Sequence, residues 1–150
     1  MKETKPITRD ELIRLLNEDL AREYQAVIAY VVYSATIKGA EFLHIKTELE
    51  KHASEELDHA IRIAKQIDYL GGNPVVVPAK VKQSPKATDM LKFDLENERV
   101  TIGHYRQRIR QAEALGEFAL SEELREIIRQ EQEHLTDLAD ALGIEPPKIG

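Results

Sequence analysis

The 150-residue sequence contains no cysteine. Disulfide bonds, cysteine-bound zinc, iron–sulfur clusters and thiol catalysis are therefore excluded. An excess of positive charge is also missing, because 21 lysines and arginines stand against 27 aspartates and glutamates and the formal net charge is -6. Nucleic acids are bound by basic patches, and here the basic residues are mixed with acids throughout. No nucleic-acid partner is expected.

Long apolar runs are missing as well. No stretch approaches 18 uncharged apolar residues, and residues 1–8 carry charges and Pro6 where a signal peptide would be apolar. We therefore expect no membrane partner, no export, and a soluble cytoplasmic protein. The length predicts a single domain, residues 1–150, that is large enough to bury a core without covalent cross-links.

What the sequence does contain is a repeated set of acidic, histidine and tyrosine residues. Four residues recur as the same type 75 positions later, and the second member of each pair lies in the second half of the chain. The pairs are Glu23 and Glu98, Tyr30 and Tyr105, Glu56 and Glu131, and His59 and His134. Each half thus holds one Glu and one Glu-x-x-His pair, whose members share a helical face.

Apolar residues recur at steps of three or four along four segments, which predicts four α-helices. Thr8 followed by Glu11 predicts a capping box at the start of the first helix. Gly39 is expected to stop that helix in the left-handed conformation. The predicted helices are residues 9–38, 41–70, 88–115 and 117–142.

The connection between the second and third helices, residues 73–87, holds three prolines and no helical period. Fully extended, its 15 residues reach roughly 45 to 50 Å, the length of a helical bundle, so it can join two parallel helices. The sequence therefore predicts an all-α fold, a four-helix bundle with a long crossover between helices two and three. Glu23 and Glu56 are nearly equidistant from Gly39, which places them at one level of an antiparallel hairpin.

Four carboxylates and two imidazoles that meet in an apolar interior require neutralisation, because an unpaired buried carboxylate costs several kcal/mol. Two divalent ions would balance the four negative charges. Oxygen ligands with one imidazole per ion suit iron or manganese. Each residue alone has an ordinary interpretation as a core histidine, a core tyrosine or a solvated glutamate, and only the shared offset indicates a site. A degenerate repeat that binds nothing is the alternative.

Four segments around these residues resemble the ligand segments of bacterioferritin and its relatives in the ferritin-like superfamily, over about residues 9–142. They are LNEDLAREYQAVIAY, EELDHA, LKFDLENE and RQEQEHL. The resemblance implies that the catalytic metal ligands are Glu56 and Glu131 as bridges, Glu23 and Glu98 as terminal ligands, and His59 and His134, with Tyr30 beside them.

The resemblance also implies an activity. It would be that of a ferroxidase with two iron ions per chain, or manganese or zinc as substitutes, which oxidises Fe(II) with dioxygen or hydrogen peroxide. The purpose would be iron storage or detoxification in a homo-oligomeric cage. A rubrerythrin-like or manganese-catalase-like enzyme that scavenges peroxide without storage is the alternative, and an assembly protein with a vestigial site is a third hypothesis.

Three features depart from the bacterioferritin pattern. Leu57 stands where that family has a haem-binding methionine, so haem is not expected. The chain ends seven residues after Gly143, where the family has a fifth helix that lines fourfold axes, so a 12-subunit cage is expected as readily as one of 24 subunits. Lys51 and Glu55 occupy the positions of the inner-surface iron ligands, and we expect Glu55 on a solvated flank together with Asp58.

Some residues outside the repeat also carry expectations. His52 lies one turn before Glu56, but its counterpart at the 75-residue offset is Ile127. It is expected to be an accessory metal ligand or a partly exposed polar contact. His44 and His104 are expected at the surface. Residues 24–35 are apolar around more than one face, which predicts a homodimer contact.

Overall fold

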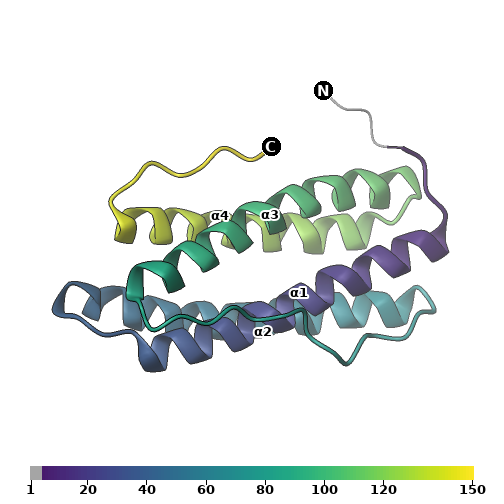
Figure 1. The fold of residues 1–150 in the computed structure, drawn as a ribbon. Helices are drawn as coiled ribbons and strands as arrows, with labels where there is room; N and C mark the ends of the chain where they lie inside the picture. Colours follow the sequence, from purple (N-terminus) through teal and green to yellow (C-terminus); the bar gives the residue numbers. More distant parts are fainter. Residues whose placement is uncertain (1–4) are drawn as a thin grey trace.

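The computed structural model describes residues 5–150 of the chain. Its helices are α1 (Arg9–Thr36), α2 (Leu43–Tyr69), α3 (Ala87–Ala114) and α4 (Phe118–Leu142), with a short 3-10 helix η1 (Ala40–Phe42) before α2. No strand occurs within residues 5–150. The predicted all-α four-helix bundle is confirmed, and Figure 1 shows the two hairpins, α1 with α2 and α3 with α4, packed on one another.

The helix ends follow local capping chemistry. Thr8 Oγ1 accepts a hydrogen bond of 3.1 Å from the backbone N–H of Glu11, as predicted. The last helix ends at Gly143 in the left-handed conformation, with φ 69° and ψ 31°. The expectation for Gly39 is wrong, because α1 ends at Thr36 and Gly39 has φ 120° and ψ 140°. Ile37 ends the helix by turning extended, and its side chain is buried in the apolar core.

The crossover runs along α1 (Figure 1). Hydrogen bonds between residues 73–82 and α1 fix it there. Near its start, the Asn17 side chain accepts from the N–H of Val75 at 2.8 Å and donates to the carbonyl of Asn73 at 3.0 Å. Farther on, Gln25 donates to the carbonyl of Lys80 at 2.5 Å. Such bonds satisfy backbone groups that an extended segment without a sheet partner would leave unpaired.

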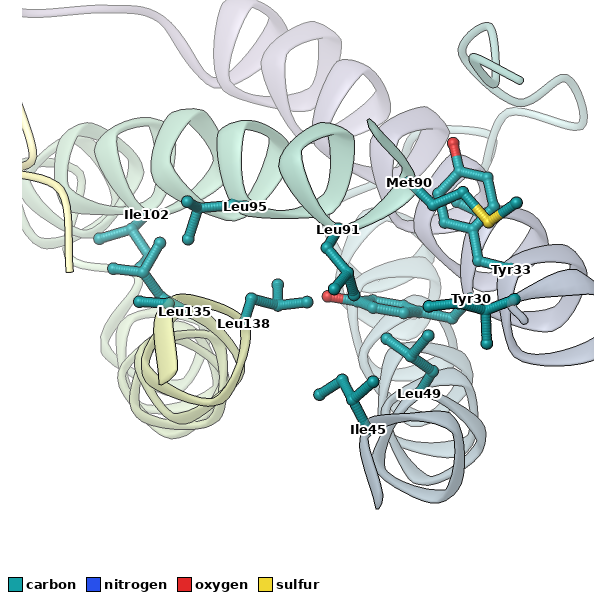
Figure 2. Packing of buried hydrophobic residues seen from close by; sticks show 13 residues of the cluster. Tyr30, Tyr33, Ile45, Leu49, Met90, Leu91, Leu95, Ile102, Leu135 and Leu138 are labelled. Carbon is teal, nitrogen blue, oxygen red and sulfur yellow. The ribbon is translucent and has the colours of Figure 1, made fainter. Parts of the chain in front are cut away.

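Two apolar clusters fill the two ends of the bundle. Figure 2 shows the first, in which Tyr30 and Leu49 from α1 and α2 meet Leu91 and Leu138 from α3 and α4. The second cluster contains residues from the other end of each helix, such as Leu16, Ile67 and Leu124. The level between the clusters is where Glu23, Glu56 and their counterparts lie, so water is excluded from both sides of that level.

A buried ion pair joins the two hairpins about one helical turn from the level of Glu23, toward the second apolar cluster. Arg108 of α3 donates to both carboxylate oxygens of Asp19 of α1, at 2.7 Å and 3.1 Å. The side chains are only 6% and 1% exposed. Burial raises the pKa of Asp19, and the adjacent guanidinium offsets only part of that rise. Bidentate geometry is what makes such a buried pair tolerable.

Removing one partner of this pair should destabilise the fold. We expect Arg108→Met to lower the free energy of unfolding by about 3 to 5 kcal/mol, since Asp19 would be left buried without a counter-charge. Urea denaturation of the metal-free protein, followed by circular dichroism, measures the effect. The double variant Asp19→Leu with Arg108→Met removes both charges and should recover most of the loss. A single variant as stable as the wild type would contradict the account.

Candidate metal centre

The six residues predicted as metal ligands lie together in the middle of the bundle. Glu23 comes from α1, Glu56 and His59 from α2, Glu98 from α3, and Glu131 and His134 from α4. Each lies where an apolar residue would continue the helix's inward stripe, and each is at most 2% exposed. The fold thus brings together all six from four separate helices.

Within this group the ligand atoms form two sets, each within 4.8 Å. One set is Glu23, Glu56, His59 and Glu131, and the other is Glu56, Glu98, Glu131 and His134. Glu56 and Glu131 belong to both sets. The arrangement can therefore hold two metal ions side by side, with these two carboxylates placed to contact both.

The two sets match closely in geometry. His59 Nδ1 lies 2.9 Å from Glu131, 3.6 Å from Glu23 and 3.7 Å from Glu56. His134 Nδ1 lies 2.9 Å from Glu56, 3.6 Å from Glu98 and 3.7 Å from Glu131. The 75-residue offset in sequence is therefore an approximate twofold relation in space.

The outer nitrogens of the two histidines meet residues that share the same offset. His59 Nε2 lies 2.6 Å from Gln130 Oε1, and His134 Nε2 lies 3.5 Å from Glu55 Oε1. The expectation that Glu55 lies on a solvated flank is wrong, because its side chain is 19% exposed and lies against His134. Asp58 does face solvent, at 60% exposed. An acceptor at Nε2 leaves Nδ1 to face the centre.

Two buried tyrosines cross from one hairpin to the other. The hydroxyl of Tyr30 donates to Glu98 at 2.7 Å, and that of Tyr105 donates to Glu23 in a short hydrogen bond. Burial and the nearby carboxylate charges raise the pKa of both tyrosines well above the usual value. Both therefore remain hydrogen-bond donors that hold the outer carboxylates in place.

Burial and proximity divide the four carboxyl groups into two kinds. Burial, followed by the charges of Glu23 and Glu98, raises the pKa of Glu56 well above its usual value. Burial and the charges of Glu56 and Glu98 do the same for Glu131. Burial also opposes ionisation of Glu98, but the contacts from His134 and the other neighbours outweigh it and bring its pKa to about 2.

The remaining groups of the centre follow the same logic. Burial raises the pKa of Glu23, but contacts with Glu56 and His59 outweigh it and the net shift is downward. Burial lowers the pKa of His134, but the carboxylates of Glu55 and Glu98 raise it to about 10. The pKa of His59 is likewise raised. Without metal, the raised pKa values of the two histidines and of Glu56 and Glu131 therefore favour protons on these groups, which lowers the net charge of the centre.

The donor atoms that face the centre lack proper hydrogen bonds. In residues 5–150 no hydrogen bond of acceptable geometry reaches either carboxylate oxygen of Glu56, or Nδ1 of His59 and His134. One carboxylate oxygen each of Glu23, Glu98 and Glu131 also has no hydrogen-bond partner within residues 5–150. Buried polar atoms are nearly always paired, so this concentration at one point fits metal coordination. Carboxylate and imidazole donors suit iron, manganese or zinc.

Two buried aspartates near the centre, Asp19 and Asp94, were not predicted from the sequence. Asp94 is 2% exposed, and burial together with the charge of Glu98 raises its pKa well above the usual value. It lies 75 residues after Asp19, so the same offset could have identified both. The position 75 residues before Arg108 is Tyr33, and Asp94 therefore lacks the guanidinium partner that Asp19 has.

The other histidines divide between surface and interior. His44 and His104 are exposed, as expected. The prediction of partial exposure for His52 is wrong, because it is only 1% exposed. Its ring stacks on that of His134 with centroids 4.0 Å apart, and its Nε2 lies 3.1 Å from Asp137 Oδ2. The stripe of α2, in which Leu49, His52 and Glu56 follow at steps of three and four, indicates burial of this position. Only the fold shows that the rings covering it come from α4 and α1.

Comparison with known proteins agrees with this geometry. The family model of the ferritin-like domain matches residues 13–145. The chain belongs to the ferritin-like domain family. Among sequence relatives, it is 26% identical to a bacterioferritin of Desulfovibrio desulfuricans over 127 residues, which cover 84% of this chain and 71% of the relative. It is also 26% identical over 144 residues to a protein of Synechococcus sp. named a nutrient stress-induced DNA-binding protein, with 89% and 82% covered.

Solved ferritin-like structures superpose over most of the chain. A ferritin-like diiron-carboxylate protein of Bacillus anthracis is 36% identical, with a TM-score of 0.86 over 95% of this chain and 99% of that one. A dodecameric thioferritin of Bacteroides fragilis, described as bacterioferritin-related, is 26% identical, with a TM-score of 0.84 and coverage of 91% and 87%. The bacterioferritin of Desulfovibrio desulfuricans is 25% identical, with a TM-score of 0.80 and coverage of 88% and 78%.

These matches confirm the resemblance to bacterioferritin and its diiron-carboxylate relatives. None of the helices within residues 5–150 combines the length and apolar character needed to cross a membrane.

The protonation of the centre predicts that metal binding releases protons. Filling both positions with Zn(II) near pH 7 should release protons, because the two imidazoles and the carboxyl groups of Glu56 and Glu131 have raised pKa values. Lowering the pH should weaken binding, since protons then compete more strongly. Calorimetric titration in buffers of different ionisation enthalpy measures the number.

A matched variant tests the source of these protons. Glu56→Gln removes one protonated carboxyl group and should release about one proton fewer. If the wild type released no protons, the pKa values of these carboxyl groups and imidazoles would not be raised in the metal-free centre. That result would contradict the prediction.

Proposed function

We propose that the chain is one ferritin-like domain that binds two iron ions and oxidises Fe(II) with dioxygen or hydrogen peroxide. The observation that supports this ferroxidase function is the set of buried, unpartnered donor atoms at one level of the bundle. Ferroxidase activity would serve iron storage or detoxification.

Two groups of residues would hold the two ions. Glu23 and His59 would bind one ion, and Glu98 and His134 the other. Glu56 and Glu131, which lie in both ligand sets, would contact both ions. The ions, when bound, supply the electrons that reduce the oxidant. Iron is proposed because relatives of this chain are diiron-carboxylate proteins and bacterioferritins, with manganese or zinc as substitutes.

The residues around the ligands would hold the ligand side chains in place and exclude bulk water. Tyr30 and Tyr105 hold Glu98 and Glu23 by hydrogen bonds from the opposite hairpin. Gln130 fixes the ring of His59 through Nε2. The apolar clusters above and below exclude bulk water, which strengthens the attraction between the carboxylates and a cation. Haem has no place in the proposal, since Leu57 stands at the position of the ligand in bacterioferritin.

Assembly into a homo-oligomer forms part of the proposal. On the outside of the bundle Ile28, Leu57 and Val76 are 40%, 52% and 88% exposed, and together they line an apolar hollow. This surface includes part of residues 24–35, where a homodimer contact is predicted. One structural relative is described as dodecameric and another is a bacterioferritin, which supports a cage of 12 or 24 subunits.

Nucleic acid is left out of the proposal. One relative carries a DNA-binding name, but that name describes the relative. This chain has a net charge of -6, and phosphate binding requires a basic surface.

Loss of a shared ligand should remove the activity. We expect Glu56→Ala to slow Fe(II) oxidation by more than about 100-fold, because changes even in supporting residues of metal sites cost up to about that factor. Stopped-flow absorbance after aerobic addition of Fe(II) measures the rate. Glu50→Ala, which removes an exposed carboxylate from the same helix, is the matched control and should keep the wild-type rate. Wild-type oxidation by Glu56→Ala would refute the assignment.

The apolar hollow should control assembly. We expect Leu57→Arg to shift the protein from a cage or dimer toward monomers, because a charge would be buried in the contact. Native mass spectrometry measures the subunit number. Leu43→Arg makes the same change at an exposed position roughly 21 Å away along α2 and should assemble normally.

The wild-type spectrum also tests storage. A large shell that takes up many iron ions per chain would support a storage cage. A dimer that holds no more than two irons per chain would overturn the cage and favour the peroxide-scavenging alternative.

A further inference from the structure

A second group of metal-binding side chains lies beside the centre, between α2 and α4. Glu48 and His52 are one turn apart on α2, and Asp137 faces them from α4. Ligand atoms of all three lie within 4.8 Å of one another. His52 is 1% exposed, whereas the Asp137 side chain is 41% exposed. The group therefore has one buried imidazole and two carboxylates that reach toward solvent.

The solvent side of this group is an acidic hollow of about 340 Å³. Glu48 and Asp137 line it, together with Glu41, Asp140 and the imidazole of His44. No lysine or arginine of the described chain is among its lining residues. Four carboxylates around one concavity produce a negative potential that concentrates cations there.

The inner side of the group leads to the metal centre. The ring of His52 stacks on that of His134 at 4.0 Å, and the ring of Tyr30 packs edge-on against it at 5.1 Å. His52 Nδ1 is buried and has no hydrogen-bond partner within residues 5–150. The imidazole thus separates the acidic hollow from a ligand of the centre, and one of its nitrogens is left without a partner.

The internal repeat supplies an independent comparison, because the opposite side of the centre is built from the residues at the 75-residue offset. There Glu123, Ile127 and Arg62 replace Glu48, His52 and Asp137. The guanidinium of Arg62 forms short ion pairs with Glu123 and with Glu126. On that side a protein cation neutralises the carboxylates, and the buried position of the histidine holds an apolar Ile127.

The side of Glu48 and Asp137 keeps the acid that corresponds to Glu123, has Lys51 at the position of Glu126 and has no arginine at the position of Arg62. Aspartate stands where the other half has its cation, and histidine stands where it has isoleucine. Carboxylates with one imidazole form a donor set for a divalent transition-metal ion.

We propose that Glu48, His52 and Asp137 form a third binding site for a divalent transition-metal cation. The site lies between the acidic hollow and His134, so it would load the two inner positions through the side occupied by His134. The loading role rests on the proposed function, whereas binding of the cation does not. The acidic hollow would collect the ion, and the three side chains would hold it before it passes inward.

The test counts and locates bound ions without relying on activity. Crystals of the wild type soaked in Co(II) should show anomalous scattering at about three positions per chain, one of them among Glu48, His52 and Asp137. The double variant Glu48→Gln with Asp137→Asn should lose that position and keep the other two. Both changed side chains are at least partly exposed and keep their shape, so the fold should be retained.

Kinetics and a matched control complete the experiment. The double variant should fill the inner positions with Fe(II) about tenfold more slowly but to the same final number, comparable to the effect of altering supporting residues of a metal site. Glu133→Gln, an exposed change on α4, should behave as the wild type. Absence of a wild-type ion at this position, or an unchanged ion in the double variant, would overturn the third site.

The remaining outcomes separate the two proposals. Empty inner positions with an occupied third site would refute the proposed two-iron centre while supporting the new cation site. An occupied third site whose loss leaves the filling rate unchanged would overturn its loading role.

Discussion

The desolvation of four carboxyl groups at one level of the bundle is the constraint on which the structure depends. Ionised together in a dry interior they would repel one another and lose their hydration. The fold meets this cost with two histidines, two tyrosine hydroxyls and raised pKa values at Glu56 and Glu131. Protons lower the net charge of the centre in the absence of metal, and divalent ions are the natural replacement. The apolar clusters on both sides shield from bulk water the groups at which divalent ions would replace protons.

The 75-residue repeat makes the two halves of the centre geometrically alike. The positions where the repeat is broken make its two sides different. Tyr30 and Tyr105 each support the glutamate of the opposite hairpin, so neither hairpin can form the centre alone. The two halves diverge one turn away, where Arg62 closes one side with ion pairs and His52 occupies the other. The two symmetric sets of candidate ligands thereby lie between two unlike flanks of the bundle.

Much of the fold could be predicted because two signals in the sequence agree. The helical periodicity predicts each helix, and the 75-residue spacing predicts which residues of the two hairpins lie at the same level. The observed helices begin and end within two residues of the predicted bounds. The prediction for Gly39 is wrong because Ile37 leaves the helix to reach the core, and this depends on apolar residues of other helices that pack in the same cluster. The exposure of Glu55 depends on another helix in the same way, since Glu55 lies against His134 of α4. His52 is on the buried stripe of α2, and its partners come from α4 and α1.

The sequence by itself determined the four helices, the crossover and the six side chains that converge, because the 75-residue offset places identical groups at equivalent heights of two hairpins. Only the tertiary structure decided which groups share protons, which oxygens lack partners and which tyrosine supports which glutamate. Those properties depend on distances of a few ångströms between helices that are far apart in the chain. Burial of His52 against His134, with Asp137 beside it, belongs to the same class.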